Sequence, residues 1–85
     1  MALQNPVVSV GSVSGACTEA FDYDPTTKLV VYHGWAGPGV GKDAAAWAIA
    51  KFTYNVDNNC TDIQWAGDST AFANVWNDRA TLSYS

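Results

Sequence analysis

The first stretch of clear alternation between hydrophobic and polar residues covers residues 21–35. Phe21 and Tyr23 alternate with aspartates, and the tetrapeptide Asp-Pro-Thr-Thr that follows is typical of a turn. A β-branched and aromatic run comes next. A period of two places Leu29, Val31, His33 and Trp35 on one face of this run, and Val30 and Tyr32 on the other. We therefore predict a β-hairpin over residues 21–35.

Residues 43–54, DAAAWAIAKFTY, fit two interpretations. Asp43 before an alanine run is typical of an N-cap that opens a helix, whereas the large apolar residues that follow also suit a strand buried on both faces. After the polar loop 55–59, residues 61–65 alternate again and favour the second half of a hairpin. We favour a strand from about Trp47 to Asn55, with the alanines as a helical lead-in.

The closing stretch, WAGDSTAFANVWNDRATLSYS, predicts a short helix near residues 69–77. Phe72, Val75 and Trp76 take the i, i+3 and i+4 positions of an apolar stripe. The Asn-Asp-Arg triplet after Trp76 is expected to end the helix, with an Asp–Arg contact holding the turn. Residues 79–85 then alternate as a final strand.

Residues 1–18 differ from the rest because they are small and almost uncharged. They show no compact helical face, and Pro6 keeps the segment open. Val8, Val10 and Val13 alternate as in a short strand, and the segment equally fits an extended N-terminal arm that orders against a neighbouring molecule, which is the interpretation we favour. The predicted assembly contacts are Val7, Val8, Val10 and Val13.

The remaining residues, 19–85, are expected to form a single small domain of mainly β structure. We predict an antiparallel β-sandwich or barrel-like arrangement with the one short helix near 69–77. The predicted core residues are Trp47, Ile49, Trp65, Phe72, Trp76 and Leu82. A chain of 85 residues buries only about 60% of its unfolded surface, so such a core is thin.

The net charge of the chain and the distribution of its cations restrict the kinds of partner that it can bind. Four Lys or Arg residues against eight Asp or Glu residues leave a net charge of −4, and the four cations are scattered along the chain. Phosphate binding needs clustered cations, so we expect no nucleic-acid partner. No apolar run approaches the roughly 20 residues of a membrane span, and no secretory signal pattern is visible. We expect a chain made in the cytoplasm, without a membrane partner.

Cys17 and Cys60 are the only cysteines. A bridge between them would close a long loop, worth about 3–4 kcal/mol in the chain-entropy model. A cytoplasmic product keeps its thiols reduced. A Cys17–Cys60 disulfide and two reduced thiols therefore both stay open.

A catalytic constellation is hard to assemble from this sequence. His33 is the sole histidine, and its Val-Tyr-His-Gly-Trp context is more typical of a packed strand residue than of a triad member. Asp22 and Asp24 share a face, but a solvated strand end next to a turn is the simpler interpretation. A calcium site built from Asp22, Asp24 or Asp57 is conceivable, but these residues do not have the spacing of an EF-hand loop. We predict no enzyme activity, no cofactor and no metal.

Tryptophans on a small sheet can also stack against sugar rings. The candidates for such a platform are Trp35, Trp47, Trp65 and Trp76. Four large aromatics are, however, about what a domain of this size needs to fill its interior. A glycan partner is therefore the alternative hypothesis, and packing is the favoured one.

Residues 28–85, taken as one unit, resemble a group of very short proteins encoded among the structural genes of tailed bacteriophages. The resemblance lies in Val-Val-Tyr-His-Gly-Trp-Ala, Ala-Trp-Ala-Ile-Ala-Lys-Phe-Thr-Tyr, Ile-Gln-Trp-Ala-Gly-Asp and the ending Phe-Ala-Asn-Val-Trp-Asn-Asp-Arg-Ala-Thr-Leu-Ser-Tyr-Ser. It implies a virion protein: a capsid decoration, a connector protein or a tail or fibre accessory. Its partners would be major capsid or tail proteins and further copies of itself.

Overall fold

The computed structural model describes residues 17–67 and 71–85. Their elements, in chain order, are β1 (Thr18–Tyr23), β2 (Val30–Ala36), β3 (Ala45–Tyr54), β4 (Cys60–Trp65), β5 (Asn74–Val75) and the 3-10 helix η2 (Trp76–Thr81). The predicted class, mainly antiparallel β with one short helix, is confirmed. The assembly contacts predicted at Val7, Val8, Val10 and Val13 lie outside the described residues, as does nearly all of the predicted arm.

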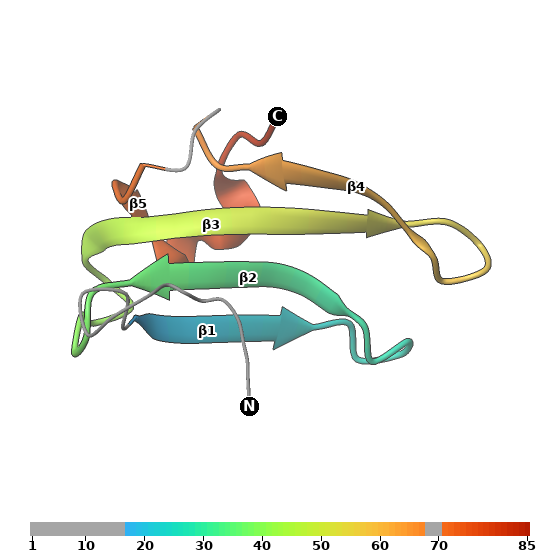
Figure 1. The fold of residues 1–85 in the computed structure, drawn as a ribbon, viewed down its shortest axis with the longest axis horizontal. Helices are drawn as coiled ribbons and strands as arrows, with labels where there is room; N and C mark the ends of the chain where they lie inside the picture. The colour runs from blue at the N-terminus through green and yellow to red at the C-terminus, as the bar shows by residue number, and fades with distance from the viewer. Residues whose placement is uncertain (1–16, 68–70) are drawn as a thin grey trace.

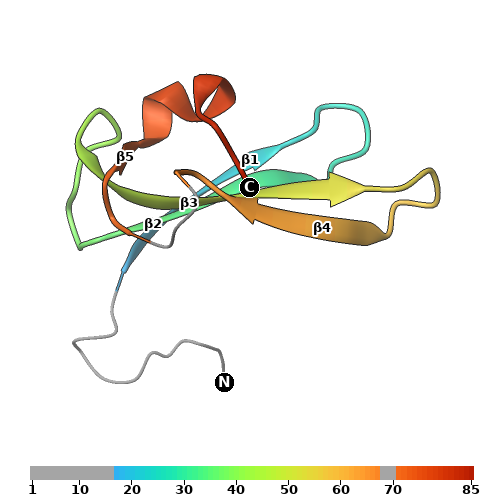
Figure 2. The same cartoon turned by 90° about the horizontal axis from the view of Figure 1, so that it is seen from above.

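The strands form one antiparallel sheet in which β1, β2, β3 and β4 lie side by side in sequence order (Figure 1). The short strand β5 pairs with the beginning of β3, where Ala45 lies opposite Val75. The described sheet stays open, so the predicted closure into a sandwich or barrel is wrong. Its second layer consists of η2 and the C-terminal residues, on one side only (Figure 2).

The first predicted hairpin is confirmed, and its turn explains why the chain reverses there. The Asp24 carboxylate accepts hydrogen bonds from the backbone N–H groups of Thr26 and Thr27, at 2.7 and 2.9 Å. The Lys28 N–H donates to the Asp24 carbonyl at 2.8 Å, with Lys28 in the left-handed region at φ 67°. The Asp24 N–H donates to the Leu29 carbonyl at 2.9 Å, which closes the turn directly before β2 begins at Val30.

The alanine-rich segment is a strand, so the predicted helical lead-in is wrong. Ala45 already belongs to β3, whose middle pairs with β2 on one edge and β4 on the other. Ala48 lies opposite Trp35, and Ala50 lies opposite Trp65. The small side chains leave room for these large rings, and the two ladders outweigh alanine's modest intrinsic preference for helix.

The C-terminal segment departs most from expectation, because η2 begins at Trp76 and the predicted helix near residues 69–77 was placed too early. Residues 74–75 are extended against β3, and the Asn74 side-chain amide donates to the Trp47 carbonyl at 3.2 Å. The predicted last strand, residues 79–85, is reduced to one isolated β-bridge, in which Tyr84 pairs with Ala66. The start of η2 and the loss of the last strand are both decided by pairing with distant segments, β3 and Ala66, which a local sequence pattern does not contain.

The core lies between the sheet and η2. Its buried hydrophobic residues are Ala20, Ala36, Trp47, Ile49, Ala66 and Trp76. Gly34 makes the close packing feasible, since a Cβ there would lie 2.6 Å from Cε3 of Trp76. The buried Trp47 indole keeps its hydrogen bond by donating Nε1–H to the Gly41 carbonyl at 3.0 Å.

Candidate functional site

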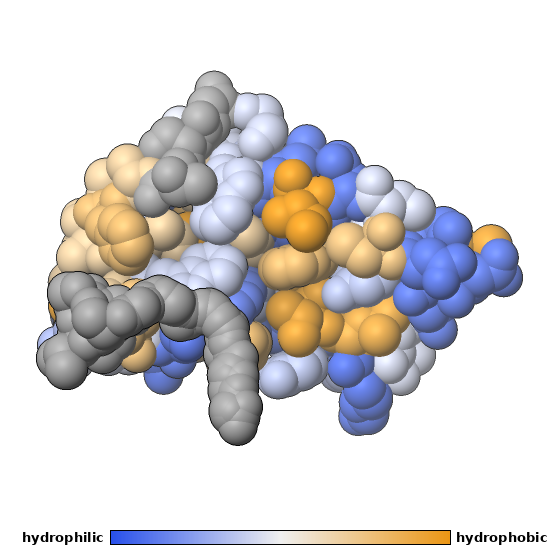
Figure 3. All heavy atoms as spheres, viewed as in Figure 1, coloured by the Kyte–Doolittle hydropathy of each residue, from blue (hydrophilic) through white to orange (hydrophobic). Residues whose placement is uncertain are grey.

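The face of the sheet opposite η2 is covered by none of the other described elements (Figure 2). We call this surface the open face. By strand register it comprises Glu19, Phe21, Tyr23, Val31, His33, Trp35, Ala48, Ala50, Phe52, Ile63 and Trp65. Phe21, Tyr23 and Ile63 are 47%, 54% and 50% exposed. Hydrophobic residues gather on this face over β2, β3 and β4 (Figure 3).

Five rings on the open face form a continuous stack, which we call the aromatic row. The members are, in order, Tyr23, Phe21, His33, Trp35 and Trp65. The successive ring centroids are 6.4, 4.2, 3.7 and 5.4 Å apart. The planes of neighbouring rings differ by 24–30°, so all four pairs are close to parallel. The packing is tightest at His33, whose ring lies 4.2 Å from Phe21 and 3.7 Å from Trp35.

Two alanines allow the row to cross β3. Trp35 belongs to β2 and Trp65 to β4, so the width of β3 separates their backbones. Ala48 and Ala50 of β3 face the same side and are only 3% and 0% exposed. The two indoles meet above these small residues and bury them. The open face is thus a packed, ordered layer although no described element covers it.

Charge is almost absent from the open face. Of the four charged residues within the strands, Asp22, Lys51 and Asp62 face the η2 side by register. Glu19 is the exception, and its Oε1 lies 2.8 Å from Nε2 of His33. His33 sits between the rings of Phe21 and Trp35, which occupy both faces of its imidazole. The histidine is therefore engaged in packing and in a single local polar contact.

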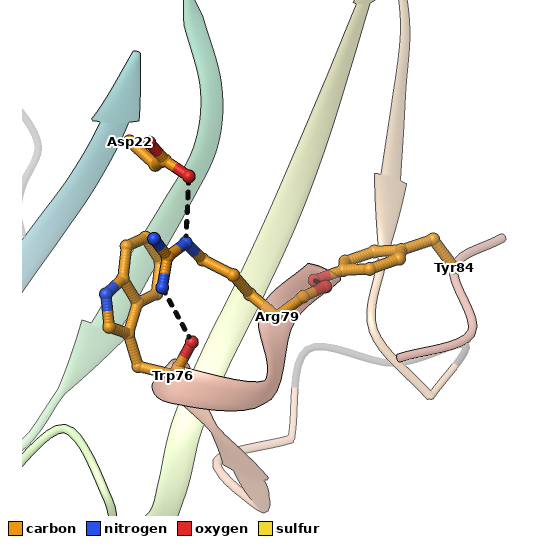
Figure 4. A network of polar contacts seen from close by, with 4 residues as sticks. All are labelled: Asp22, Trp76, Arg79 and Tyr84. Atoms are coloured by element: carbon orange, nitrogen blue, oxygen red, sulfur yellow. Dashed lines mark hydrogen bonds and ion pairs between the residues drawn. The ribbon is translucent and has the colours of Figure 1, made fainter. Parts of the chain in front are cut away.

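The opposite side of the sheet holds a polar network that fastens η2 to β1 (Figure 4). Nε of Arg79 donates to Oδ2 of Asp22 at 3.0 Å, and Nη1 donates to the Trp76 carbonyl at 3.2 Å. The guanidinium carbon lies 4.6 Å from the Trp76 ring centroid. The predicted Asp–Arg contact within the Asn-Asp-Arg triplet is therefore replaced by one across 57 residues. We interpret this network as one that stabilises the fold by holding η2 against β1.

Tyr84 completes the network, since its hydroxyl donates to the Arg79 carbonyl at 2.8 Å. Burial, reinforced by the neighbouring Tyr32, raises the pKa of Tyr84 to about 12. Asp24, the second of the two carboxylates that share the β1 end, accepts the turn hydrogen bonds from Thr27 and Thr26, which lower its pKa. Asp22 and Asp24 are thus both engaged in contacts that hold the fold.

The predicted core residues fall into three groups. Trp47, Ile49 and Trp76 are buried, and Leu82 packs against them while partly exposed. Trp65 is half-buried, but it belongs to the open face. Phe72 is 55% exposed, so its placement in the core is wrong. It precedes β5 and lies outside η2, and the expected apolar stripe does not form.

No disulfide joins Cys17 and Cys60, which are both exposed. Cys17 directly precedes β1 and Cys60 begins β4, and these strands are the two edges of the four-strand path. Three strand spacings of about 4.8 Å separate the edges, roughly 14 Å in all, which exceeds the Cα distance of about 7 Å that a disulfide can bridge.

Sequence reasoning missed the aromatic row as a unit. The alternation correctly separated His33 and Trp35 from Tyr32, but it did not show which face would be covered. Gly34 was the available signal, because a glycine within a strand often marks a close approach by another segment. A covering segment on the Gly34 side leaves His33 and Trp35 on the other side.

Fold and site together define a small open-sheet β protein with one apolar, aromatic face. No protein family, curated protein or solved structure matches the chain. Among the residues that the structure describes, no helix is long and apolar enough to cross a membrane. The same residues contain no cluster of three or more His, Cys, Asp or Glu side chains placed to hold a metal ion.

Proposed function

We propose that this protein is a non-enzymatic structural subunit of a bacteriophage particle, made in the host cytoplasm and incorporated in several copies. The observation that carries the proposal is the open face. Aromatic enrichment and depletion of charge distinguish the centres of protein interfaces from ordinary surface. Exposed apolar surface of this kind on a small chain marks a contact site. The setting in a virion is supported by the resemblance of residues 28–85.

The reactive side chains support a structural role. His33 is held between two rings and against Glu19. Asp22 is engaged by Arg79, and Asp24 stabilises the β1–β2 turn. Each of these groups contributes to folding or packing, and an assembly subunit requires nothing more of them.

In this proposal residues 1–18 attach the subunit to a capsid or tail protein. The segment is uncharged up to Thr18 and rich in valine and serine. Such a sequence can add a strand to the exposed edge of another chain's sheet, with backbone hydrogen bonds providing affinity. The attached protein would serve as a capsid decoration, a connector component or a fibre accessory.

Quantitative mass spectrometry of purified particles tests the proposal. We expect a fixed number of copies per particle: hundreds for a capsid decoration or a long tail, and about a dozen or fewer for the neck, baseplate or fibres, where ring symmetry sets the number. Finding none would refute the proposal. Deleting residues 1–15 should abolish incorporation and leave the far-UV circular dichroism unchanged, whereas normal incorporation would refute the role of the arm.

A carbohydrate-binding module is the second candidate, because Tyr23 and Trp65 at the ends of the aromatic row each stack against only one described ring. Sugars bind to ring faces, however, and every ring of the row already stacks against at least one neighbouring ring. The geometry thus favours a protein contact. A shift in tryptophan fluorescence on addition of one glycan from a broad panel, lost in Trp65→Ala, would favour the module instead.

A further inference from the structure

The open face differs from the η2 side because its side chains pack against one another although none of the described elements covers them. Its inner rings are packed against one another, and the alanines beneath are buried. The outer members, Phe21, Tyr23 and Ile63, remain about half exposed. Rings already fixed by their neighbours lose little conformational entropy when a partner binds. The face is therefore preorganised for contact.

The shape of the face restricts the partner. Four adjacent strands present an almost continuous surface, and such surfaces pack best on another sheet, about 10 Å away and with strands inclined by about 30°. Four strands of six to ten residues, spaced about 4.8 Å apart, give a flat footprint of about 400 Å². This is about half of the about 800 Å² that each partner buries in a standard interface.

The charge distribution favours a second copy of this chain. Each chain carries a net charge of −4, which opposes self-association in general. The strand charges other than Glu19 face the η2 side, and Glu19 is held by His33. Two copies can therefore bring their open faces together without placing unpaired like charges between them. A two-fold axis through the face would match aromatic row to aromatic row.

We propose that a second copy of this chain covers the open face, so that two open sheets form one β-sandwich across a two-fold interface. The inference rests on the proposed function only in treating this face as a protein-contact surface. In a virion the two N-terminal arms of such a dimer would attach it at two points. The dimer also gives a small 85-residue domain a second covering layer, which the described residues supply on the η2 side only.

Sedimentation equilibrium of the full chain between about 1 and 100 µM tests the inference, since interfaces of this size have dissociation constants in the micromolar range or tighter. We expect a mass twice the 9.1 kDa of one chain. Phe21→Lys and Ile63→Lys should each weaken the dimer at least tenfold, because a lysine ammonium would be buried without a partner. Both positions are half-exposed on edge strands, so the monomer tolerates the substitution.

Val56→Lys is the matched control. Val56 is a β-branched aliphatic residue like Ile63, and it is 95% exposed in the turn between β3 and β4. This variant should dimerise as the wild type does. A dimer that persists in both face variants, or that weakens equally in Val56→Lys, would overturn the inference. If one face variant fails to fold, the other decides.

A wild-type monomer at about 100 µM would also overturn the inference. Deletion of residues 1–15 then identifies the true occupant: a dimer appearing only after the deletion would show that this segment covers the face within one chain. The two proposals fail separately. A dimer missing from particles refutes the virion role alone, and a monomer counted on particles refutes the second copy alone.

Discussion

Gly34 sets the distance between β2 and the layer above it. The Trp76 indole lies directly over the position that a side chain would take, and Trp47 lies beside it. A hydrogen atom in place of a methyl group is therefore part of the packing of two of the four tryptophans. The same residue identifies the covered face, because its register neighbours on β1 and β3, Ala20 and Ile49, are both buried.

Gly34→Ala should destabilise the fold by about 1–3 kcal/mol, the usual cost of overpacking a core. The added Cβ would lie 2.6 and 2.8 Å from two carbons of the Trp76 ring. Urea unfolding followed by tryptophan fluorescence measures the change. Gly37→Ala is the control, since its Cβ would meet Val40 at an ordinary 3.6 Å. Equal effects in the two variants would contradict the packing account.

The raised pKa of Tyr84 leads us to predict that the folded protein loses stability at alkaline pH. Its pKa of about 12 in the folded protein exceeds the about 10 of an unfolded chain. Its contribution is complete below pH of about 10 and declines as the pH rises towards about 12, because the unfolded chain releases the proton first. In Tyr84→Phe the urea midpoint should vary less over this range, and at pH of about 8 the lost hydrogen bond should cost about 1 kcal/mol.

The exposed Tyr23 supplies the comparison for that experiment, since it is 54% exposed. Tyr23→Phe should retain the alkaline slope of the wild type. If Tyr84→Phe retains it as well, burial of the Tyr84 hydroxyl does not determine the pH dependence.

At the scale of elements, the two hairpins are the parts that sequence alone predicts well, because their information is local. The Asp-Pro-Thr-Thr turn and the alternation on each side lie within about 15 residues of one another. The C-terminal segment is different. Residues 74–75 pair with β3, almost thirty positions earlier, and this pairing delays the helix to Trp76. Local periodicity does not record such a partner.

The hairpin turns give a prediction at this scale. Lys28 and Asn58 both adopt positive φ, at 67° and 65°. The left-handed region costs an ordinary residue about 1–2 kcal/mol, while asparagine tolerates it better. Lys28→Gly should therefore stabilise the protein by about 0.5–1 kcal/mol, and Asn58→Gly by less, as measured by the urea midpoint. A loss of stability in Lys28→Gly would show that its side chain contributes contacts that outweigh the strain.

At the scale of the whole molecule, the two sides of the sheet have opposite character. One side carries Trp47 of β3 and Trp76 of η2, and the other carries Trp35 and Trp65 in the aromatic row. The sequence predicts four large aromatics on a small sheet, and it cannot divide them between an interior and an interface. That division depends on where the C-terminal residues pack, which is a property of the folded chain.

The most direct test of the open face as the contact between two copies of this chain is the concentration dependence of the four tryptophan indole N–H signals in ¹H–¹⁵N NMR spectra. On dilution of the full chain, the signals of Trp35 and Trp65 should shift as the face is released. The signals of Trp47, whose indole N–H donates to the Gly41 carbonyl, and of the buried Trp76 of η2 should stay in place. Shifts confined to Trp47 and Trp76, or no shift in any of the four, would contradict the account.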